Sequence, residues 1–432
     1  MIFFHLKLKI FIECSMRRFA SSTSDVIVDT LIIGGGVMGL STAYHLSNLR
    51  HGSKNDPSIT VIERDPTYTH NSAVLSAGGI RQQFSLRENV EMSLVGSRFI
   101  REHKDELQFQ EHGYLFLSTT EQGHAQLQKN LQVQIEAGCS TTEVVSKAEL
   151  EGLYGDWMNT EDLVAAGRSS SGEGWFDPMS LLQLFKRKAC DENKVEYVKG
   201  EIVAARREDD SDSSKITHVV IADSPTSTIT YHVNTVVNAA GAGAAKVMDI
   251  LSPPPQIISF PVHPKKRCVF YFKCADDRQP VNAPLTVDKG GVYFRSEGSN
   301  FICGVSPDAA NDHDCLDVAD LERVDHELFT DVIWPTIYNR VPAFGDIKVT
   351  SSWAGLYEYN VFDQNAIIGY HPEAKNVVCV NGFSGHGLQQ GVAAGIGVSE
   401  LIERGAFETV DLRRFGYERI IKGEKLLELG IV

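Results

Sequence analysis

The segment DTLIIGGGVMG (29–39) decides the fold. It reads as a short apolar β-strand that runs into a glycine-rich turn, and helical periodicity follows from 37 to 49. Gly34, Gly36 and Gly39 have the G-x-G-x-x-G spacing. In that motif the first glycine makes a tight turn, the second lets backbone approach a pyrophosphate, and the third lets the helix pack on the strand. The segment therefore predicts a Rossmann-like unit that binds a dinucleotide.

A second predicted strand, SITVIERD (58–65), carries Glu63 near its end. A carboxylate at this point accepts hydrogen bonds from ribose hydroxyls and would repel a 2′-phosphate. We assign Glu63 and the adjacent Arg64 to the dinucleotide. The polar stretch 51–58 reads as a loop insertion that lengthens the usual spacing between the glycines and the acid. The motif alone does not separate NAD from FAD.

Two segments far along the chain favour a flavin. GFSGHGLQQG (382–391) follows a strand at 377–380 and reads as a second glycine-rich turn that opens a helix. Backbone N–H groups at such a helix start stabilise negative charge on the pyrimidine side of a reduced flavin. The small residues of VVNAAGAGA (236–244) let the chain close over a cofactor, and the strand 197–207 can lie beside an adenine. The sequence thus predicts a flavin dinucleotide held from both ends of the chain.

From residue 28 to about 415 the chain resembles the FAD-dependent amine and amino-acid oxidoreductases typified by D-amino-acid oxidase and sarcosine oxidase. Within that family it is particularly similar to a mitochondrial member that is associated with assembly of respiratory complex I. The segments that carry this similarity are SAGGIRQQFSL (76–86), EGWFDP (173–178), YFRSEGSNF (293–301), RVPAF (340–344), SSWAGLYEYNVFDQNAIIG (351–369) and GFSGHGLQQG (382–391).

The resemblance implies an α/β fold like that of D-amino-acid oxidase. In it, a Rossmann-like FAD-binding domain is interleaved with a second substrate domain built on a mixed or antiparallel sheet. The expected division is a mitochondrial presequence at 1–27, an FAD-binding domain at 28–110, 178–255 and 351–432, and a substrate domain at 111–177 and 256–350.

The resemblance also implies a set of cofactor-binding residues. Ser76 to Gly79 would pass along the flavin edge, Ile202 would lie against the adenine, and N–H groups from Gly385 to Gly387 would approach a flavin carbonyl. The expected set is Gly34, Gly36, Gly39, Glu63, Arg64, Ser76, Gly78, Gly79, Ile202, Gly241, Gly385, His386, Gly387 and Leu388. The imidazole of His386 is expected to pack or form hydrogen bonds rather than to act as a base.

Arg81 and Arg295 are the candidate catalytic residues. Arg81 follows the flavin-edge loop, where the family often places a basic residue over the ring or on a substrate carboxylate. Arg295 would clamp a carboxylate through two hydrogen bonds, or form a structural ion pair at a strand edge. An aromatic group would either wall an amine cavity or pack between the domains: Trp353, Tyr357 and Tyr359, with Glu358 among them.

Two positions depart from the sarcosine oxidases. Gln389 stands where those enzymes use a lysine to hold the substrate carboxylate, and Leu356 stands where they attach flavin through a cysteine. We therefore expect non-covalent FAD and no fast oxidase chemistry. EGWFDP is read as structure, because Asp177 suits a helix N-cap and Pro178 the first helical position of a helix to about Cys190.

The first 28 residues are basic, rich in serine and poor in acids, which is typical of a mitochondrial presequence. A secretory signal is the alternative, but charges interrupt its apolar run. Met16 is an alternative start. No apolar run reaches the roughly 18 residues of a spanning helix. We expect location in the matrix or on the matrix face of the inner membrane, with peripheral association at most.

The formal net charge of −15 argues against nucleic-acid binding, which needs a basic face. The eight cysteines form no CxxC pair or metal-ligand spacing, so we expect buried thiols and no metal site. Two functions stay open at this point. One is amine or amino-acid oxidation by hydride transfer to FAD. The other is a flavin-stabilised assembly factor whose partners are complex I subunits or assembly intermediates.

Overall fold

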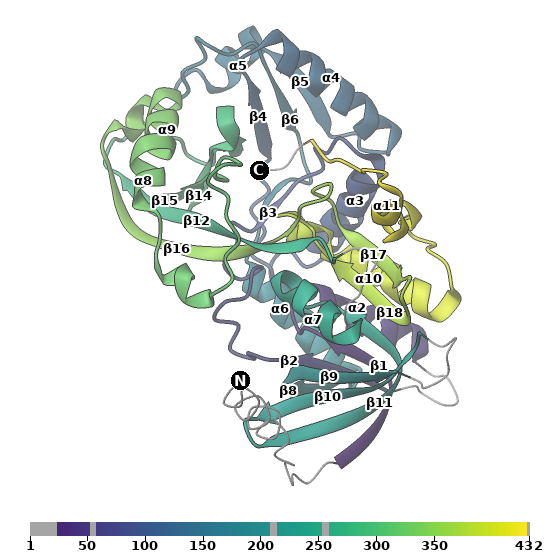
Figure 1. The fold of residues 1–432 in the computed structure, drawn as a ribbon. Coiled ribbons are helices and arrows are strands. Elements are labelled where there is room, and N and C mark those ends of the chain that lie inside the picture. The colour runs from purple at the N-terminus through teal and green to yellow at the C-terminus, as the bar shows by residue number, and fades with distance from the viewer. Residues whose placement is uncertain (1–23, 52–57, 208–213, 253–258, 430–432) are drawn as a thin grey trace, which may run out of the picture.

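The computed structural model describes residues 24–51, 58–207, 214–252 and 259–429. Most of the predicted presequence therefore lies outside the described residues, and so does Cys14. Within the described part, the chain forms two eight-stranded sheets and a small two-stranded one. Figure 1 shows the second sheet towards the top of the molecule and most strands of the first towards the bottom, with α10 and the edge strands β17 and β18 of the first sheet in the middle.

The first sheet begins with the predicted dinucleotide unit. Strands β1, β2, β8, β11 and β18 form a parallel core, while β17, β10 and β9 add antiparallel pairs. The order is β17-β18-β11-β1-β2-β8, with β10 on β11 and β9 on β10. The bounds are β1 (Ser24–Ile33), β2 (Ile59–Glu63), β8 (Glu196–Lys199), β9 (Glu201–Arg207), β10 (Ile216–Ser224), β11 (Ser227–Asn238), β17 (Ile367–His371) and β18 (Ala374–Asn381).

This sheet is buried on both faces because successive side chains of a strand point to opposite sides. Ile32 joins one apolar cluster, while Leu31 and Ile33 join the other. Helices α2 (Val37–Arg50), α3 (Arg87–Glu102), α6 (Pro178–Lys186), α7 (Ala244–Leu251) and α10 (Gly387–Arg404) accompany the sheet. α10 packs against α2 and α3, and most of its residues are buried, so the far end of the chain lies in the centre of this domain.

The second sheet is mostly antiparallel, with one parallel pair between β4 and β13. Its order is β16-β12-β15-β14-β13-β4-β6-β5. The bounds are β4 (Tyr114–Ser118), β5 (Thr142–Ser146), β6 (Ala165–Ser169), β12 (Val262–Cys274), β13 (Leu285–Val287), β14 (Tyr293–Glu297), β15 (Asn300–Gly304) and β16 (Ile347–Asn360).

The remaining elements are short or lie beside the second sheet. They are β3 (Gly79–Ile80) paired with β7 (Gly174–Trp175), the helices α4 (Glu121–Glu136), α5 (Lys147–Tyr154), α8 (His326–Leu328), α9 (Trp334–Arg340) and α11 (Glu418–Lys422), the π-turns at Arg187–Glu192 and Phe329–Ile333, and the 3₁₀ turns at Gly241–Gly243, Lys289–Gly291, Val318–Glu322, Pro342–Gly345 and Arg413–Phe415.

The predicted fold class is confirmed: an α/β dinucleotide-binding domain is interleaved with a second domain on a mostly antiparallel sheet. The chain enters the second sheet at β4, returns to the first at β8, and crosses again at β12 and after β16. The predicted change of domain at residue 351 falls inside β16, whose pairing with β12 continues to Asn360. A single long strand therefore carries the chain from the second sheet to the edge of the first domain.

The helix predicted after EGWFDP is confirmed. The Asp177 carboxylate accepts hydrogen bonds from the backbone N–H groups of Met179 and Ser180, and Pro178 takes the first helical position. α6 ends at Lys186, and a π-turn continues it to Glu192.

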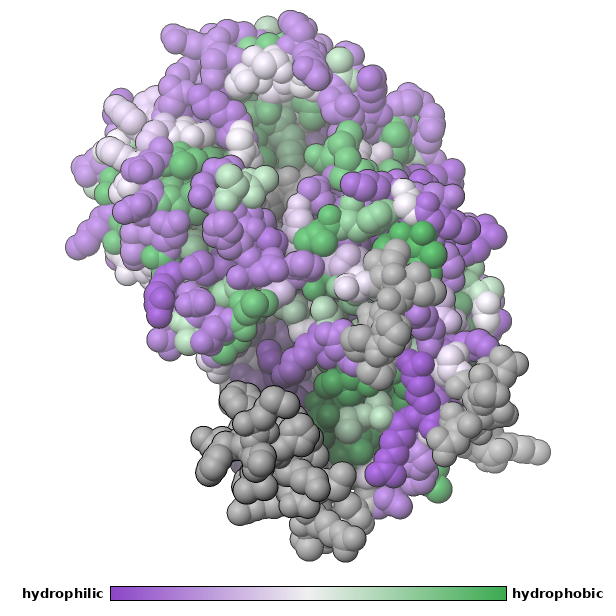
Figure 2. Space-filling model, viewed as in Figure 1, coloured by the Kyte–Doolittle hydropathy of each residue, from purple (hydrophilic) through white to green (hydrophobic). Residues whose placement is uncertain are grey.

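Most of the visible surface is hydrophilic, and hydrophobic residues gather on it in small groups (Figure 2). None of the helices in the described ranges is both long enough and apolar enough to cross a bilayer. The seven cysteines of the described residues are free thiols.

Candidate cofactor-binding site

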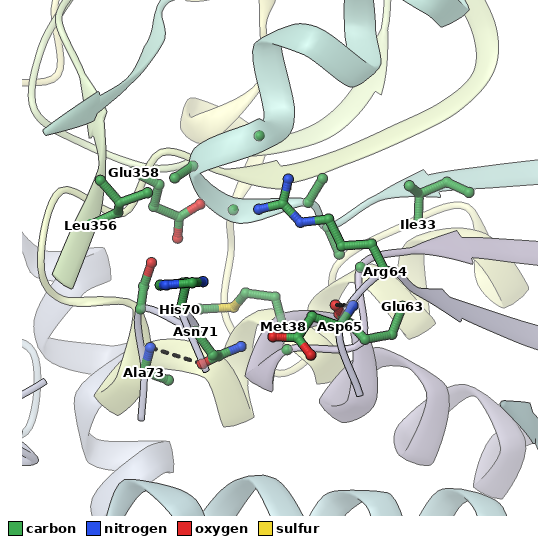
Figure 3. Close-up of a pocket in the computed structure, with 18 of the residues that line it drawn as sticks. Ile33, Met38, Glu63, Arg64, Asp65, His70, Asn71, Ala73, Leu356 and Glu358 are labelled. Carbon is green, nitrogen blue, oxygen red and sulfur yellow. Dashed lines mark hydrogen bonds between the residues drawn. The ribbon is translucent and has the colours of Figure 1, made fainter. Parts of the chain in front are cut away.

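A cavity of about 540 Å³ lies between the two domains. One end is lined by Glu63 and Ile202, and the other by Leu356, Gly385 and Gly387. Its walls come from the β1–α2 turn, the end of β2, the start of β9, the β11–α7 turn, β16 and the start of α10. Figure 3 shows side chains from several of these segments pointing into the same space. The two ends of the chain thus contribute to one site.

The β1–α2 turn holds the ends of three strands together. The Gly34 N–H donates to the Ile62 carbonyl at 2.8 Å, which joins β1 to β2. Gly34 has φ +108°, and a Cβ there would overlap the carbonyl oxygen of Ala239 just after β11. Only glycine satisfies both conditions. A Cβ on Gly36, by contrast, would come no nearer than 3.3 Å to its closest neighbour, Nδ2 of Asn71, so this position borders the cavity.

Two helices point uncapped first turns at the cavity. α2 starts after Gly36 and α10 after His386, and neither N-cap residue makes a side-chain capping bond. Neither helix has an acidic residue in its first turn. The first N–H groups of a helix need partners outside it and carry partial positive charge, so these two starts suit a ligand with negative charge.

Glu63 is fixed by the backbone around it. Its Oε2 accepts from the Gly35 N–H and its Oε1 from the Asp65 N–H, both at 2.8 Å. A carboxylate has about four lone-pair sites, so both oxygens retain capacity for ribose hydroxyls. Arg64 extends over the cavity beside it (Figure 3), and Ile202 supplies a buried apolar wall. This end has the polarity that an adenosine requires.

The loop between β2 and β3 contributes residues that the sequence analysis missed. His70, Asn71 and Ala73 line the cavity, and Asn71 Oδ1 accepts from the Ala73 and Val74 N–H groups. These contacts fold the loop into a wall opposite the β11–α7 turn. The sequence signal was the polar run THNSA (69–73), two residues before SAGGI (76–80), but nothing in its composition shows that it turns inward.

Glu358 belongs to the group that was predicted either to wall an amine cavity or to pack between the domains, and it is the most informative member of that group. Its carboxyl group lines the cavity and accepts from the Gly382 N–H at 3.1 Å. It also accepts from the Phe383 N–H, but burial outweighs both bonds and raises the pKa of Glu358 to about 7. A proton-exchanging group therefore lies at the α10 end of the cavity.

Most of the predicted cofactor residues line this cavity, and some do not. The lining members are Gly34, Gly36, Glu63, Arg64, Ser76, Ile202, Gly241, Gly385, Gly387 and Leu388. Gly39, Gly78, Gly79 and His386 lie behind the wall instead. A Cβ on Gly39 would overlap the Gly34 carbonyl, and one on Gly79 would overlap the Tyr114 hydroxyl, so both glycines serve close packing.

Arg81 does not line the cavity. Its guanidinium is buried, donates to the Gln83 carbonyl, and lies 4.0 Å from the centre of the Phe84 ring and 5.1 Å from that of Phe116. Burial lowers the pKa of Arg81, while nearby Tyr114, Glu428 and Glu173 partly offset this effect. The group stands between the flavin-edge loop and β4, behind the wall of the cavity.

Arg295 also lies behind the wall. Its Nε donates to the Ala77 carbonyl at 2.9 Å, and its Nη1 donates to the Ser296 carbonyl and to Glu297. The guanidinium carbon lies 5.1 Å from the centre of the Trp175 ring. The structure therefore places Arg295 as a clamp on the loop 76–79.

The His386 ring is packed, as expected. It is 2% exposed and meets the Phe84 ring edge-on with 5.3 Å between centres. Neither ring nitrogen has a hydrogen-bond partner within the described ranges. Burial, followed by the charge of Arg81, lowers the pKa of His386 to about 4. The imidazole is neutral at physiological pH.

The aromatic residues of β16 differ in whether they line the cavity, as the first predicted role requires, or pack elsewhere. Tyr357 lines the cavity, whereas the Trp353 indole donates to the Leu75 carbonyl at 2.9 Å and the Tyr359 hydroxyl accepts from Gln364. Leu356, the residue before Tyr357, also lines the cavity.

A model of the FAD dependent oxidoreductase family matches residues 29–401. The chain belongs to the FAD-dependent oxidoreductase family. "FAD-dependent oxidoreductase domain-containing protein 1" of Xenopus laevis is 40% identical over 94% of this chain and 85% of its own length. The Drosophila melanogaster homolog of that protein is 32% identical over 94% of this chain and 81% of its own length.

Solved structures of this FAD-dependent oxidoreductase fold superpose over most of the chain. L-proline dehydrogenase from P. horikoshii has a TM-score of 0.75 and 22% identity, covering 93% of this chain and all of that one. Glycine oxidase from Geobacillus kaustophilus has a TM-score of 0.71 and 18% identity, covering 90% and 98%. FAD is the cofactor, and the cavity fits it: an acid for the ribose at one end, two uncapped helix starts for negative charge, and glycines where side chains would fill the space.

Proposed function

We propose that this FAD-dependent oxidoreductase family member acts in mitochondria, supports assembly of respiratory complex I and oxidises a small amine or amino acid. One observation carries the oxidoreductase part: both ends of the chain and a strand of the second sheet close a single cofactor cavity. The mitochondrial and complex I parts rest on the composition of residues 1–28 and on the resemblance to a complex I assembly protein. Complex I subunits or assembly intermediates are the proposed partners.

We propose that different residues of the cavity bind different parts of FAD. The β1–α2 turn and the uncapped start of α2 would hold the diphosphate, and Glu63 would hold the ribose. The N–H groups from Gly385 to Gly387 would stabilise negative charge at the pyrimidine side. Bound FAD supplies a two-electron acceptor for hydride, and the protein orients the substrate and excludes water. Leu356 offers no nucleophile, so we propose that FAD is held without a covalent bond.

We propose that Arg81 and Arg295 affect the substrate side of the site indirectly, by positioning neighbouring backbone. Arg295 fixes the loop 76–79 through the Ala77 carbonyl, and Arg81 lies directly after that loop. We propose that they set the flavin-edge backbone. A direct clamp on a substrate carboxylate would require both guanidinium groups to leave their present contacts.

Two narrower functions are alternatives. One is an amine or amino-acid dehydrogenase with no role in assembly. The other is an assembly factor in which FAD only stabilises the fold. The replacement of the substrate lysine by Gln389 favours the second. The half-buried Glu358 in the cavity, whose pKa is raised to about 7, favours an enzyme.

The cofactor and the chemistry are tested on purified protein. We expect a flavin absorbance spectrum whose chromophore is released into the supernatant on acid precipitation. We then expect anaerobic bleaching of the flavin by at least one secondary amine or amino acid in a panel. Yellow protein that no amine reduces would contradict amine oxidation and leave the FAD-stabilised assembly factor.

The assembly role is tested by complementation of cells that lack the protein, with complex I measured on native gels. Wild type should restore the complex. Gly36→Trp, which fills the cavity, should not, provided the variant accumulates to the wild-type level. Restoration by the flavin-free variant would contradict a role for FAD in assembly. Deletion of residues 2–27 should abolish import, which fractionation measures.

A further inference from the structure

Glu358 is the carboxyl group nearest the start of α10 among the residues that line the cavity. Its Oε1 lies 3.3 Å from the position that a Cβ on Gly387 would take, and its Oε2 lies 4.0 Å from the same position on Gly241. Both neighbours are glycines, so neither of them places a side chain between this carboxyl group and a ligand. Figure 3 shows the carboxyl pointing into the cavity, with His70 on the opposite side.

The backbone fixes this carboxyl group. Oε2 accepts from the Gly382 N–H, and the Glu358 carbonyl accepts from the Ser384 N–H at 3.1 Å. Glu358 therefore joins β16 of the second sheet to the turn that opens α10. A side chain held on two sides keeps one geometry, which a group that meets a reacting atom requires.

Glu358 forms no ion pair with another residue in the described part of the chain. On the α10 side, His386 is neutral. On the paired strand β12, His263 and Lys265 are both engaged by Asp314. Tyr357 flanks Glu358 on its own strand. Three basic side chains line the same cavity, Arg64, His70 and Lys246, of which Lys246 pairs with Glu201. The other titratable side chains that line it are Glu63, Asp65, Tyr68 and Glu201.

The guanidinium groups that would recognise a substrate carboxylate are occupied elsewhere. Arg81 is engaged by the Gln83 carbonyl and two rings, and Arg295 by the Ala77 carbonyl and Glu297. The α10 end of the cavity thus presents an acid and keeps two cations behind its wall. This polarity fits a ligand with positive charge.

We propose that the Glu358 carboxylate binds the ammonium group of the substrate and accepts its proton, so that the substrate class is a cationic amine that needs no carboxylate group for recognition. This inference rests on the proposed amine oxidation. An ammonium nitrogen has no lone pair, so its carbon cannot lose hydride until the nitrogen loses a proton. A half-buried carboxyl group in the cavity with its pKa near neutral suits that transfer.

The step balances with FAD as the oxidant. The N–H bond of the ammonium breaks, and its proton goes to a carboxylate oxygen of Glu358. The hydrogen of the adjacent C–H bond then leaves with its electron pair to the oxidised cofactor, and a C=N bond forms. The product is an iminium ion, which water hydrolyses to a carbonyl compound and a protonated amine.

Binding and proton transfer are tested separately on FAD-loaded protein. Tetramethylammonium, a cation that carries no proton to transfer, and propionate, an anion of similar size, are titrated against the flavin absorbance. We expect tetramethylammonium to perturb the wild-type spectrum, with binding at least tenfold weaker in Glu358→Gln and partly restored in Glu358→Asp. Propionate binding should not weaken. Glu136→Gln, on the exposed side of α4, is the control.

The proton step is followed by anaerobic flavin reduction with N-methylpropylamine across pH. The wild-type rate should rise as pH rises through about 7, because the carboxylate is the accepting form. Glu358→Gln should be at least about 10²-fold slower, without that rise. The glutamine keeps an acceptor for the Gly382 N–H, so FAD content should stay at the wild-type level; loss of FAD would make Glu358 a cofactor ligand and overturn the proposal.

The outcomes separate the two levels of inference. Equal tetramethylammonium binding and equal reduction rates in wild type and Glu358→Gln would overturn the role of Glu358 and leave amine oxidation standing. Tighter binding of propionate than of tetramethylammonium would overturn the substrate class. A wild-type flavin that no amine reduces would overturn amine oxidation itself, and the proton transfer with it.

Discussion

Gln389 Oε1 accepts a hydrogen bond from the backbone N–H of Arg81 at 2.7 Å, and both residues are buried. The first turn of α10 thereby holds the chain that leaves the flavin-edge loop, over 300 residues earlier in sequence. Gln389 is therefore part of the scaffold. Its carboxamide oxygen is engaged by the backbone, and this oxygen cannot donate a hydrogen bond to a substrate carboxylate.

Gln389→Leu should destabilise the protein by about 1–3 kcal/mol, because the Arg81 N–H would lose its partner in a buried position. Gln389→Lys should destabilise it further, since an ammonium group would enter beside the buried Arg81 guanidinium. Urea unfolding measures both. Sarcosine oxidation gained by Gln389→Lys without loss of stability would show that the glutamine faces the substrate.

Substitutions at two glycines of the G-x-G-x-x-G motif should have different effects, one on folding stability and the other on FAD binding. Gly34→Ala should lower folding stability by at least about 1–3 kcal/mol, because φ is +108° and the methyl group would overlap the Ala239 carbonyl. Gly36→Trp should fold, since Gly36 has φ −75° and borders the cavity, but it should bind no FAD. Melting temperature and flavin absorbance of the two proteins check this pair. Equal flavin content in both would contradict the assignment of the cavity.

Arg295→Met should weaken FAD binding by roughly 1–3 kcal/mol, because the Ala77 carbonyl would lose its charged donor and the loop 76–79 its anchor. Glu297→Gln is the matched control: Glu297 is half exposed, so its ion pair with Arg295 contributes little. Fluorescence titration of apoprotein with FAD measures both affinities. An unchanged affinity in Arg295→Met would show that this clamp does not shape the cofactor site.

Two histidines with lowered pKa values should reduce stability on mild acidification, and the raised pKa of Glu358 should offset part of this loss. Burial lowers the pKa of His45 and of His386 from 6.5 to about 4. The unfolded chain therefore binds more protons between pH 6.5 and 4, so the free energy of unfolding decreases as pH falls through that range. Each histidine should cost roughly 2 kcal/mol at pH 5. Urea unfolding at pH 7.5 and 5 measures the difference, and His45→Phe should reduce it.

The last described residues complete a helix near the start of the chain. The Glu428 carboxylate accepts from the Ser85 and Leu86 N–H groups, the Ser85 hydroxyl and the Asn89 amide. It fixes Leu86, the N-cap residue of α3, which has no side-chain cap of its own. Glu428→Ala should therefore destabilise the protein by about 1–3 kcal/mol, because these donors would lose a charged acceptor. Amide exchange should show the largest loss of protection in the first turn of α3.

Local patterns were sufficient to predict the elements that hold the cofactor. The G-x-G-x-x-G turn, the cap at Asp177 and the glycine-rich start of α10 each depend on neighbours in sequence, and each is found where the pattern places it. The resemblance supplied the interleaved order of the two domains.

Side-chain direction at the site required the tertiary structure. Glu358 enters the cavity because β16 pairs with β12 in a register that sets Glu358 opposite Pro264, and no local pattern specifies that register. Arg295 contacts the Ala77 carbonyl from a strand more than 200 residues away. Both contacts depend on how the second sheet packs against the first domain. A sequence pattern with a period of two predicts only that successive side chains of a strand point to opposite faces of the sheet.

Because residues 34–36 and 385–388 both contribute to the cofactor cavity, bound FAD indicates that nearly the whole chain is present and folded. The N-terminal turn can form early in synthesis, but its partner helix arrives only when nearly the whole chain has emerged. A truncated chain would retain a dinucleotide motif with nothing to close over it. Flavin retention would then mark finished molecules, and any partner that recognises the loaded form would meet only those.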